Sequence, residues 1–214
     1  MQKIGVLGSG VVGKTLADAF LALGHDVMRG SRDVAKLADW KATAGAKAQT
    51  GTFADAAAFG DVLVLAVKGN VAEEALRPCG DALKGKVILD ATNPIADAAP
   101  TGGVLKFFTN LDESLMERLQ KRFPEARFVK AFSCVGNAFM FKPDFGGQKP
   151  TMFICGNDAS AKADATQILT SFGWDTEDMG EAPAARAIEP LCMLWCIPGL
   201  RGGSWSHAFK LLKK

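Results

Sequence analysis

Short apolar runs alternate with amphipathic stretches along most of the chain. The apolar runs predict strands at residues 3–7, 25–29, 47–50, 61–67, 86–90 and 127–132. The amphipathic stretches between them predict helices at residues 11–23, 33–41, 71–83 and 112–123. Alternation of this kind is typical of βαβ units, so we expect an α/β fold with a doubly wound, mostly parallel sheet.

The pattern continues more sparsely toward the C-terminus. Strands are predicted at residues 151–156 and 174–179, and helices at residues 160–172 and 184–197. Pro198 and Gly199 disturb the last turn of the second helix. We expect these extra C-terminal strands to extend the sheet and the last helix to form a helical cap.

The composition is that of a globular protein with a hydrophobic core. Of the 214 residues, 48% are hydrophobic and 22% are charged, which excludes a disordered chain. The net charge of +2 gives no broad electrostatic reason to bind nucleic acid or an anionic membrane. No apolar run reaches the roughly 18 residues of a membrane helix, and the first residues lack a signal-peptide pattern. A cytoplasmic location is therefore expected.

The five cysteines are scattered, which predicts free thiols rather than disulfides. Cys192 and Cys196 lie one helical turn apart, but no Cys or His cluster accompanies them. Buried apolar thiols are therefore favoured over a soft-metal pair, and no metal site is predicted.

A glycine-rich turn lies between the first predicted strand and the first predicted helix. Gly8, Gly10 and Gly13 have the G-x-G-x-x-G spacing of a dinucleotide-binding turn. Gly8 allows the tight turn, Gly10 lets the backbone approach a pyrophosphate, and Gly13 lets the helix pack on the strand. The N–H groups at the start of that helix would then face the phosphates. We therefore expect a Rossmann-type sheet; a turn that merely needs small residues is the alternative.

The residues after the second strand decide between NAD and NADP. An NAD site places a carboxylate there, whereas an NADP site places hydroxyls and cations around the 2′-phosphate. Here the strand has ended by Gly30, so Ser31 lies above the ribose, with Arg32 beside it. Lys36 follows one turn into the next helix, and Asp33 is interpreted as an acid at the start of that helix. NADP(H) is the predicted cofactor; ordinary surface cations are the alternative interpretation of the arginine and the lysine.

Five segments of the chain carry a resemblance to a known family: KIGVLGSGVVGKTLADAFLALGHDVMRGSRD, DVLVLAV, VILDATNP, VKAFSCVG and MFICGND. With them the chain resembles the small NADP oxidoreductases typified by deazaflavin (coenzyme F420)-dependent NADP reductase. It covers most of the chain and is most specific in the opening motifs. It implies a two-part enzyme that holds NADP along the strand ends, with a planar redox partner such as F420 or a flavin against the nicotinamide.

Carried over position by position, the resemblance implies a set of site residues. With the glycine turn included, the cofactor residues are Gly8, Ser9, Gly10, Val11, Val12, Gly13, Ser31, Arg32, Lys36, Ala66, Val67, Lys68, Val71, Asn93, Pro94 and Asn137. The acceptor side falls on Ser133, Cys134 and Val135, with His207 in the C-terminal tail.

The chain departs from the family at the acceptor side. Deazaflavin reductases tend to place histidine where this chain has Ser133, and a bulky residue where it has Lys68 and Gly69. The acceptor therefore stays open among a deazaflavin, a flavin, a quinone-like compound and a small carbonyl.

Hydride transfer between two bound rings needs no covalent nucleophile, so no catalytic residue is predicted for it. A carbonyl acceptor would also need a proton donor, for which Lys130, Lys68 and His207 are candidates. Both lysines are more simply interpreted as exposed cations. The absence of tyrosine excludes the Tyr-x-x-x-Lys catalysis of short-chain dehydrogenases. Trp205 could stack on the acceptor, although core filling or a subunit interface is slightly favoured.

The sequence therefore predicts an NADP-dependent oxidoreductase in two parts. Residues 1–132 form a dinucleotide-binding domain, and residues 133–214 form an acceptor-side subdomain packed on the same sheet. Hydride passes between the nicotinamide and an F420 or flavin-like acceptor. A non-catalytic NADPH-sensing module and a small-carbonyl reductase are the alternatives. The expected partner is a small-molecule redox acceptor, and the expected assembly is a homo-oligomer with no nucleic-acid or membrane partner.

Overall fold

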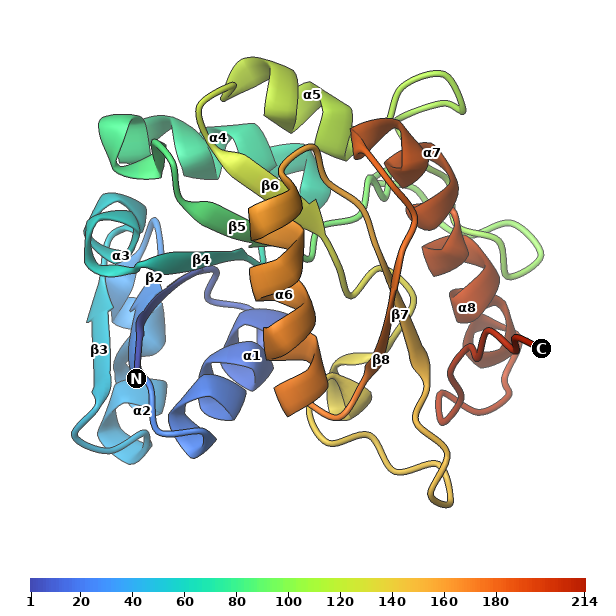
Figure 1. Ribbon diagram of the computed structural model, residues 1–214, viewed down its shortest axis with the longest axis horizontal. Coiled ribbons are helices and arrows are strands. Elements are labelled where there is room, and N and C mark those ends of the chain that lie inside the picture. Colours follow the sequence, from blue (N-terminus) through green and yellow to red (C-terminus); the bar gives the residue numbers. More distant parts are fainter.

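The computed structural model describes residues 1–214 and is built around one parallel sheet. Its strands are β1 (Lys3–Leu7), β2 (Asp26–Gly30), β3 (Ala48–Gly51), β4 (Val62–Leu65), β5 (Val87–Asp90) and β6 (Arg127–Lys130). They lie in the order β3-β2-β1-β4-β5-β6 (Figure 1). This is the order of a Rossmann fold, as predicted, and it places a crevice at the carboxyl ends of β1 and β4.

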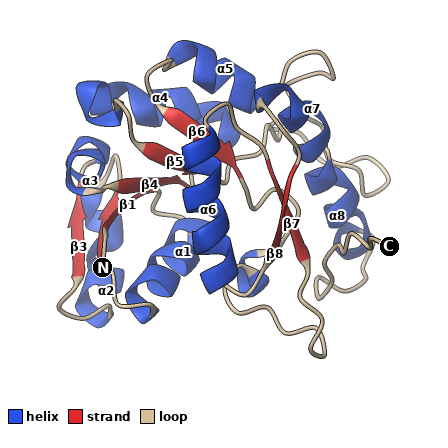
Figure 2. Cartoon of the chain, in the orientation of Figure 1, coloured by secondary structure: helices blue, strands red, loops and turns tan.

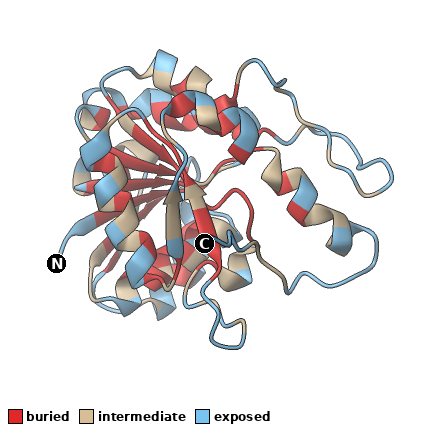
Figure 3. Ribbon diagram, turned by 45° about the vertical axis from the view of Figure 1, so that its right-hand side comes forward, coloured by how far each residue is buried: buried red, intermediate tan, exposed pale blue.

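Helices cover both faces of the sheet (Figure 2). One apolar cluster packs the sheet against α1 (Val11–Ala22), α2 (Ala38–Thr43) and α6 (Ala159–Ser171). A second cluster packs the other face against α3 (Phe53–Phe59), α4 (Ala72–Leu76), α5 (Leu115–Arg122) and α7 (Ala185–Ile188). The strands between the two layers are buried, whereas the outer faces of the helices are exposed (Figure 3). None of the helices is both long and apolar enough to cross a bilayer.

Short 3-10 turns connect several of these elements. They are η1 (Val34–Leu37), η2 (Gly69–Val71), η3 (Arg77–Leu83), η4 (Asn137–Phe139) and η5 (Ala182–Ala184). A single helix is predicted at residues 71–83, but the structure has the end of η2, then α4, then η3 there. Inside η3, Gly80 adopts a φ of 48°, which interrupts the helical backbone at that point.

The extra C-terminal strands do not extend the main sheet. β7 (Thr151–Ile154) and β8 (Asp175–Asp178) form a separate parallel pair. A single antiparallel bridge between Lys130 and Cys155 connects β6 with the segment after β7. The predicted extension is therefore wrong. The chain turns away after β6, where Phe132 has a φ of 61° that no strand residue adopts.

Two helices also differ from the sequence prediction. No helix was predicted where α3 lies, yet a capping box starts it: Thr52 Oγ1 accepts from the N–H of Asp55, and the Asp55 carboxylate accepts from the N–H of Thr52. The helix predicted at residues 184–197 is two helices, α7 and α8 (Leu191–Leu200). They separate at Pro190, which has no backbone N–H to continue the helical ladder.

Candidate dinucleotide-binding site

The glycine-rich turn joins β1 to α1 beside open space. The N–H of Gly8 donates to the carbonyl of Gly30 at 3.0 Å, which fixes the turn to the end of β2. A Cβ at Gly8 would collide with the carbonyl of Ala66, and a Cβ at Gly13 would lie 2.5 Å from the carbonyl oxygen of Gly8. A Cβ at Gly10 would meet nothing within 4 Å. Packing therefore requires the first and third glycines, while the space beside the second is free for a ligand.

A cavity of about 620 Å³ lies at the ends of β1, β2 and β4, and we call it the larger cavity. Nine predicted cofactor residues line it: Ser9, Gly10, Ser31, Arg32, Lys36, Ala66, Val67, Lys68 and Val71. Thr52, Phe53 and Ala54, at the start of α3, line it as well. Sequence reasoning missed them together with α3, although the spacing of Thr52 and Asp55 carries the signal of a capping box.

A hydroxyl and two cations gather where β2 ends. Arg32 and Lys36 are exposed and line the larger cavity, and Ser31 lies beside them. The Ser31 Oγ accepts from the N–H of Asp33 at 3.1 Å. Asp33 also lines the cavity, but its Oδ1 accepts from the N–H of Ala35 and so caps η1, as the sequence predicts. The free donors at this end suit a phosphate better than a ribose hydroxyl.

A buried arginine under the turn is a residue that sequence reasoning missed. Arg29, on β2, is only 2% exposed, and its Nη2 donates to the carbonyl oxygens of Gly8 and Gly10, at 3.2 Å each. Its guanidinium lies 4.9 Å from the centre of the Trp40 ring. Burial lowers the pKa of Arg29 below its usual value. The alternating strand pattern gives no signal for such a residue, because its partners come from other elements.

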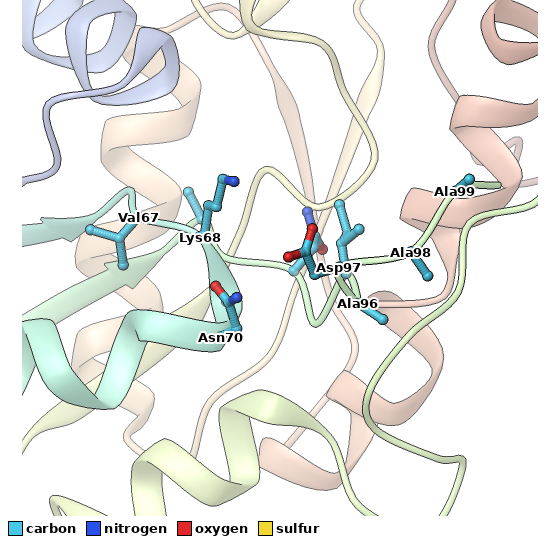
Figure 4. Close-up of a pocket in the computed structure, with 11 residues that line it drawn as sticks. Val67, Lys68, Asn70, Ala96, Asp97, Ala98 and Ala99 are labelled. Atoms are coloured by element: carbon cyan, nitrogen blue, oxygen red, sulfur yellow. The ribbon is translucent and has the colours of Figure 1, made fainter.

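A second cavity of about 510 Å³, which we call the smaller cavity, adjoins the first. Val67 and Lys68 line both cavities. In Figure 4, Val67, Lys68 and Asn70 form one wall of the smaller cavity, and the loop from Ala96 to Ala99 forms the other. Asn93 also lines it, and the buried Oδ1 of Asn93 has no hydrogen-bond partner in the protein. That oxygen can therefore accept a hydrogen bond from a ligand.

The remaining predicted cofactor residues line neither cavity. They are Gly8, Val11, Val12, Gly13, Pro94 and Asn137. The two glycines shape the turn from within, and Val11 is 59% exposed at the start of α1.

The residues predicted on the acceptor side also lie outside the two cavities. Ser133, Cys134 and Val135 follow β6 and are at most 7% exposed. Burial raises the pKa of Cys134 to about 12, so this thiol stays protonated at neutral pH. Phe132, directly before them, holds a left-handed backbone conformation that is strained for a bulky residue.

The C-terminal tail packs on itself and on the segment after β6. The His207 ring stacks on Trp195 with 4.9 Å between centroids, and its Nε2 lies 2.8 Å from the Trp195 carbonyl oxygen. Trp205 lies against Gly199 and Trp195 and stays 45% exposed. Trp195 in turn lies against Gly136, where a Cβ would be 2.7 Å from the ring. Neither His207 nor Trp205 lines either cavity.

The two candidate proton-donating lysines have opposite environments. Lys130 is fully buried, so its interpretation as an exposed cation is wrong. Its Nζ lies 2.7 Å from Asp90, 3.0 Å from Glu189 and 2.8 Å from the carbonyl oxygen of Thr92. Burial alone would lower the pKa of Lys130, but the two carboxylates outweigh burial and raise it. Lys68, in contrast, is exposed where the two cavities meet, so it is the lysine placed to act on a ligand.

Comparison with known proteins supplies the family. Residues 3–94, from β1 to the turn after β5, match the family described as NADP oxidoreductase, coenzyme F420-dependent. A crystal structure from Arthrobacter sp. FB24, provisionally assigned as an F420-dependent NADP reductase, is 33% identical, with a TM-score of 0.91 over the full length of both chains. The chain belongs to the F420-dependent NADP oxidoreductase family.

Two curated relatives are similar over parts of their length. The F420-dependent NADP reductase of Methanocaldococcus jannaschii is 29% identical over 141 residues, which are 65% of this chain and 62% of that one. The metalloreductase STEAP3 of Rattus norvegicus is 30% identical over 206 residues, 92% of this chain and 38% of that one. The chain thus spans less than two thirds of either relative. The match to the F420-dependent oxidoreductase family contains the glycine turn, the cations after β2 and Asn93.

Proposed function

We propose that the chain binds NADP(H) across the two cavities and transfers hydride between the nicotinamide and a ring acceptor. The observation that carries this proposal is the shared wall, since Val67 and Lys68 line both cavities. A dinucleotide with its 2′-phosphate near Arg32 can extend past the glycine turn and reach the smaller cavity with its other end. Residues 1–132 would then hold the cofactor, and residues 133–214 would complete the acceptor side.

The residues present fit NADP(H). The bound cofactor would supply the hydride-carrying ring. The open space beside Gly10 admits a diphosphate to the N–H groups at the start of α1. Ser31, Arg32 and Lys36 offer a hydroxyl and two cations to the 2′-phosphate. The unpartnered Oδ1 of Asn93 would accept a hydrogen bond from the nicotinamide carboxamide.

We propose a deazaflavin such as F420, or a flavin-like ring, as the acceptor. The smaller cavity is lined by alanines at positions 91, 96, 98 and 99, with Val67 and Ile95. Small apolar side chains leave room for a flat ring, and the polar part of the lining comes from Lys68, Asn70, Asn93 and Asp97. A non-catalytic sensor would be favoured by a pocket filled with the side chains of Phe107, Phe108 or Trp205. None of these three residues lines either cavity, so the enzyme is better supported than the sensor.

The position of Lys68 favours a small-carbonyl reductase as the second candidate. An exposed ammonium at the junction of the two cavities could give a proton to an alkoxide as hydride arrives. Lys68→Met would then abolish NADPH oxidation by aldehydes but leave transfer to a flavin or deazaflavin in place.

The test is a titration of the wild type and of Arg32→Ala with NADPH and NADH. Loss of a charge-assisted contact should weaken the binding of NADPH by about 1–3 kcal/mol and leave the binding of NADH nearly unchanged. Arg118→Ala is the control, since Arg118 is a half-buried arginine on α5 that pairs with Glu113 outside both cavities. Stopped-flow mixing of the NADPH complex with F420, flavin mononucleotide and simple aldehydes then identifies the acceptor class. Equal weakening of both dinucleotides would contradict the NADP assignment.

A further inference from the structure

Arg29 occupies an unusual place for a cation, buried under the glycine turn. Its Nη2 holds the carbonyls of Gly8 and Gly10, the first and second glycines of the motif. Trp40, on α2, covers the guanidinium from the other side at 4.9 Å. Arg29 does not line the larger cavity, so it can act on a ligand only through the turn and through its charge.

The charge of Arg29 is not neutralised by contact with a carboxylate. Its Nε is buried without any hydrogen-bond partner. The carboxylate of Asp18 helps to keep Arg29 charged. The two oxygens of that carboxylate, however, accept hydrogen bonds from the indole N–H of Trp40 and from the ammonium of Lys14, each at 2.7 Å. A buried, incompletely paired cation is costly unless an anion approaches it.

We propose that Arg29 is a positioning residue for the diphosphate of the bound dinucleotide. It holds the carbonyl of Gly8, and it holds that of Gly10 together with the N–H of Lys14. The N–H groups at the start of α1 are thereby left for the phosphates, and the guanidinium adds an unneutralised positive charge near them. The proposal rests on the proposed function. It assigns Arg29 to the diphosphate and not to the 2′-phosphate, because its contacts are with Gly8 and Gly10, whereas Arg32 and Lys36 lie at the end of β2.

The experiment compares three ligands: NADPH, NADH and 2′-AMP, which has the 2′-phosphate but no diphosphate. Arg29→Gln keeps a side-chain donor for the carbonyls and removes the charge. We expect this variant to weaken the affinity for NADPH and for NADH by the same factor, roughly tenfold. Its affinity for 2′-AMP should stay unchanged. Arg32→Ala is the matched control with the opposite pattern, weakening NADPH and 2′-AMP but not NADH. The affinity of Arg29→Gln for both dinucleotides should also fall less steeply with added salt.

A second variant tests the charge without touching Arg29. Asp18→Asn keeps an acceptor for Trp40 and removes the negative charge that raises the pKa of Arg29. The substitution is made together with Lys14→Gln, because Lys14 loses its partner Asp18 and its free charge would otherwise attract the dinucleotide. The double variant should bind NADPH and NADH about two- to threefold more tightly. This variant carries the test if Arg29→Gln does not fold.

Several outcomes overturn the proposal. Unchanged dinucleotide affinity in Arg29→Gln, or loss of 2′-AMP binding as large as that of NADPH, would show that Arg29 has no particular role toward the diphosphate. Unchanged or weaker binding in the Asp18→Asn variant would show the same. If the wild type binds neither dinucleotide, the proposed function fails too. If the wild type binds both and Arg32→Ala discriminates as expected, only the role of Arg29 fails.

Discussion

Asp90 and Lys130 face each other across β5 and β6 and form an ion pair with both side chains fully buried, 2.7 Å apart. Glu189 completes the group, and its carboxylate also accepts the N–H groups of Leu115 and Met116 at the start of α5. One ammonium thus connects two strands, a helix start and the junction of α7 and α8. The cluster lies directly under Thr92, whose carbonyl the lysine also holds, and so supports the chain next to Asn93.

Lys130→Met should destabilise the protein by about 3–5 kcal/mol, because it leaves two carboxylates buried without their cation. Urea unfolding followed by circular dichroism measures the loss. Lys14→Met, which breaks an exposed pair with Asp18, is the control and should cost less than about 1 kcal/mol. A loss below 1 kcal/mol in Lys130→Met would show that the cluster does not hold the strands together.

Because Lys130 has this structural role, lost activity in Lys130→Met would not identify Lys130 as a proton donor. Lys68→Met is the informative variant for that question.

Gly10→Ala should abolish or strongly weaken NADPH binding while lowering stability by no more than about 1 kcal/mol, the cost of alanine at the N-cap of α1. The added methyl meets no protein atom within 4 Å, and Gly10 has a φ of −74° that alanine adopts freely, so only a ligand is obstructed. Gly13→Ala is the matched control: its Cβ would lie 2.5 Å from the Gly8 carbonyl oxygen, so it should lower the urea midpoint itself. Tight NADPH binding by a stable Gly10→Ala protein would contradict the proposed approach of the diphosphate.

The sheet and the motif at the strand ends were predictable because both are local in sequence. Hydrophobic periodicity gives the strands, and the spacing from Gly8 to Gly13 gives the turn. Arg29 and Lys130 were not predictable, since each is buried by partners distant in sequence: Arg29 by Gly8, Gly10 and Trp40, and Lys130 by Asp90 and Glu189.

The acceptor side was harder to predict from the sequence. The smaller cavity depends on how the loop from Ile95 to Ala99 faces the end of β4, which no local pattern encodes. Ser133, Cys134, Val135 and His207 stay predictions as acceptor contacts, since they line neither cavity. The chain turns away from the main sheet at Phe132, after β6, and β7 and β8 then form their own pair. The left-handed backbone conformation of Phe132 that makes this turn cannot be read from the composition.

Acid should remove part of the stability through Glu117. Hydrogen bonding by Arg186, and then by Ser114, lowers the pKa of Glu117 from 4.5 to about 2 against the opposing effect of burial. A carboxyl whose pKa is depressed on folding stabilises the protein fully above pH 4.5 and loses this contribution as the pH falls toward 2. The difference in unfolding free energy between wild type and Glu117→Gln should therefore be constant above about pH 5 and shrink below it. Glu125→Gln, an exposed charge-matched control, should show a smaller change; identical profiles for the two variants would contradict the role of Arg186.

Cys196 should be the first cysteine to react with a thiol reagent. It is only half-buried, against the sequence expectation, and hydrogen bonding from Cys192 lowers the pKa of the Cys196 thiol. Burial raises the pKa of the other thiols, to about 11 for Cys79 and about 12 for Cys134 and Cys155, and the pKa of Cys192 is raised by its partner and by burial. Because the thiolate is the reacting species, iodoacetamide at pH 8 should add one group rapidly, and peptide mass mapping should place it on Cys196. Cys196→Ser should remove the rapid phase and Cys79→Ser should keep it, whereas first labelling at Cys134 would mean that the loop after β6 opens in solution.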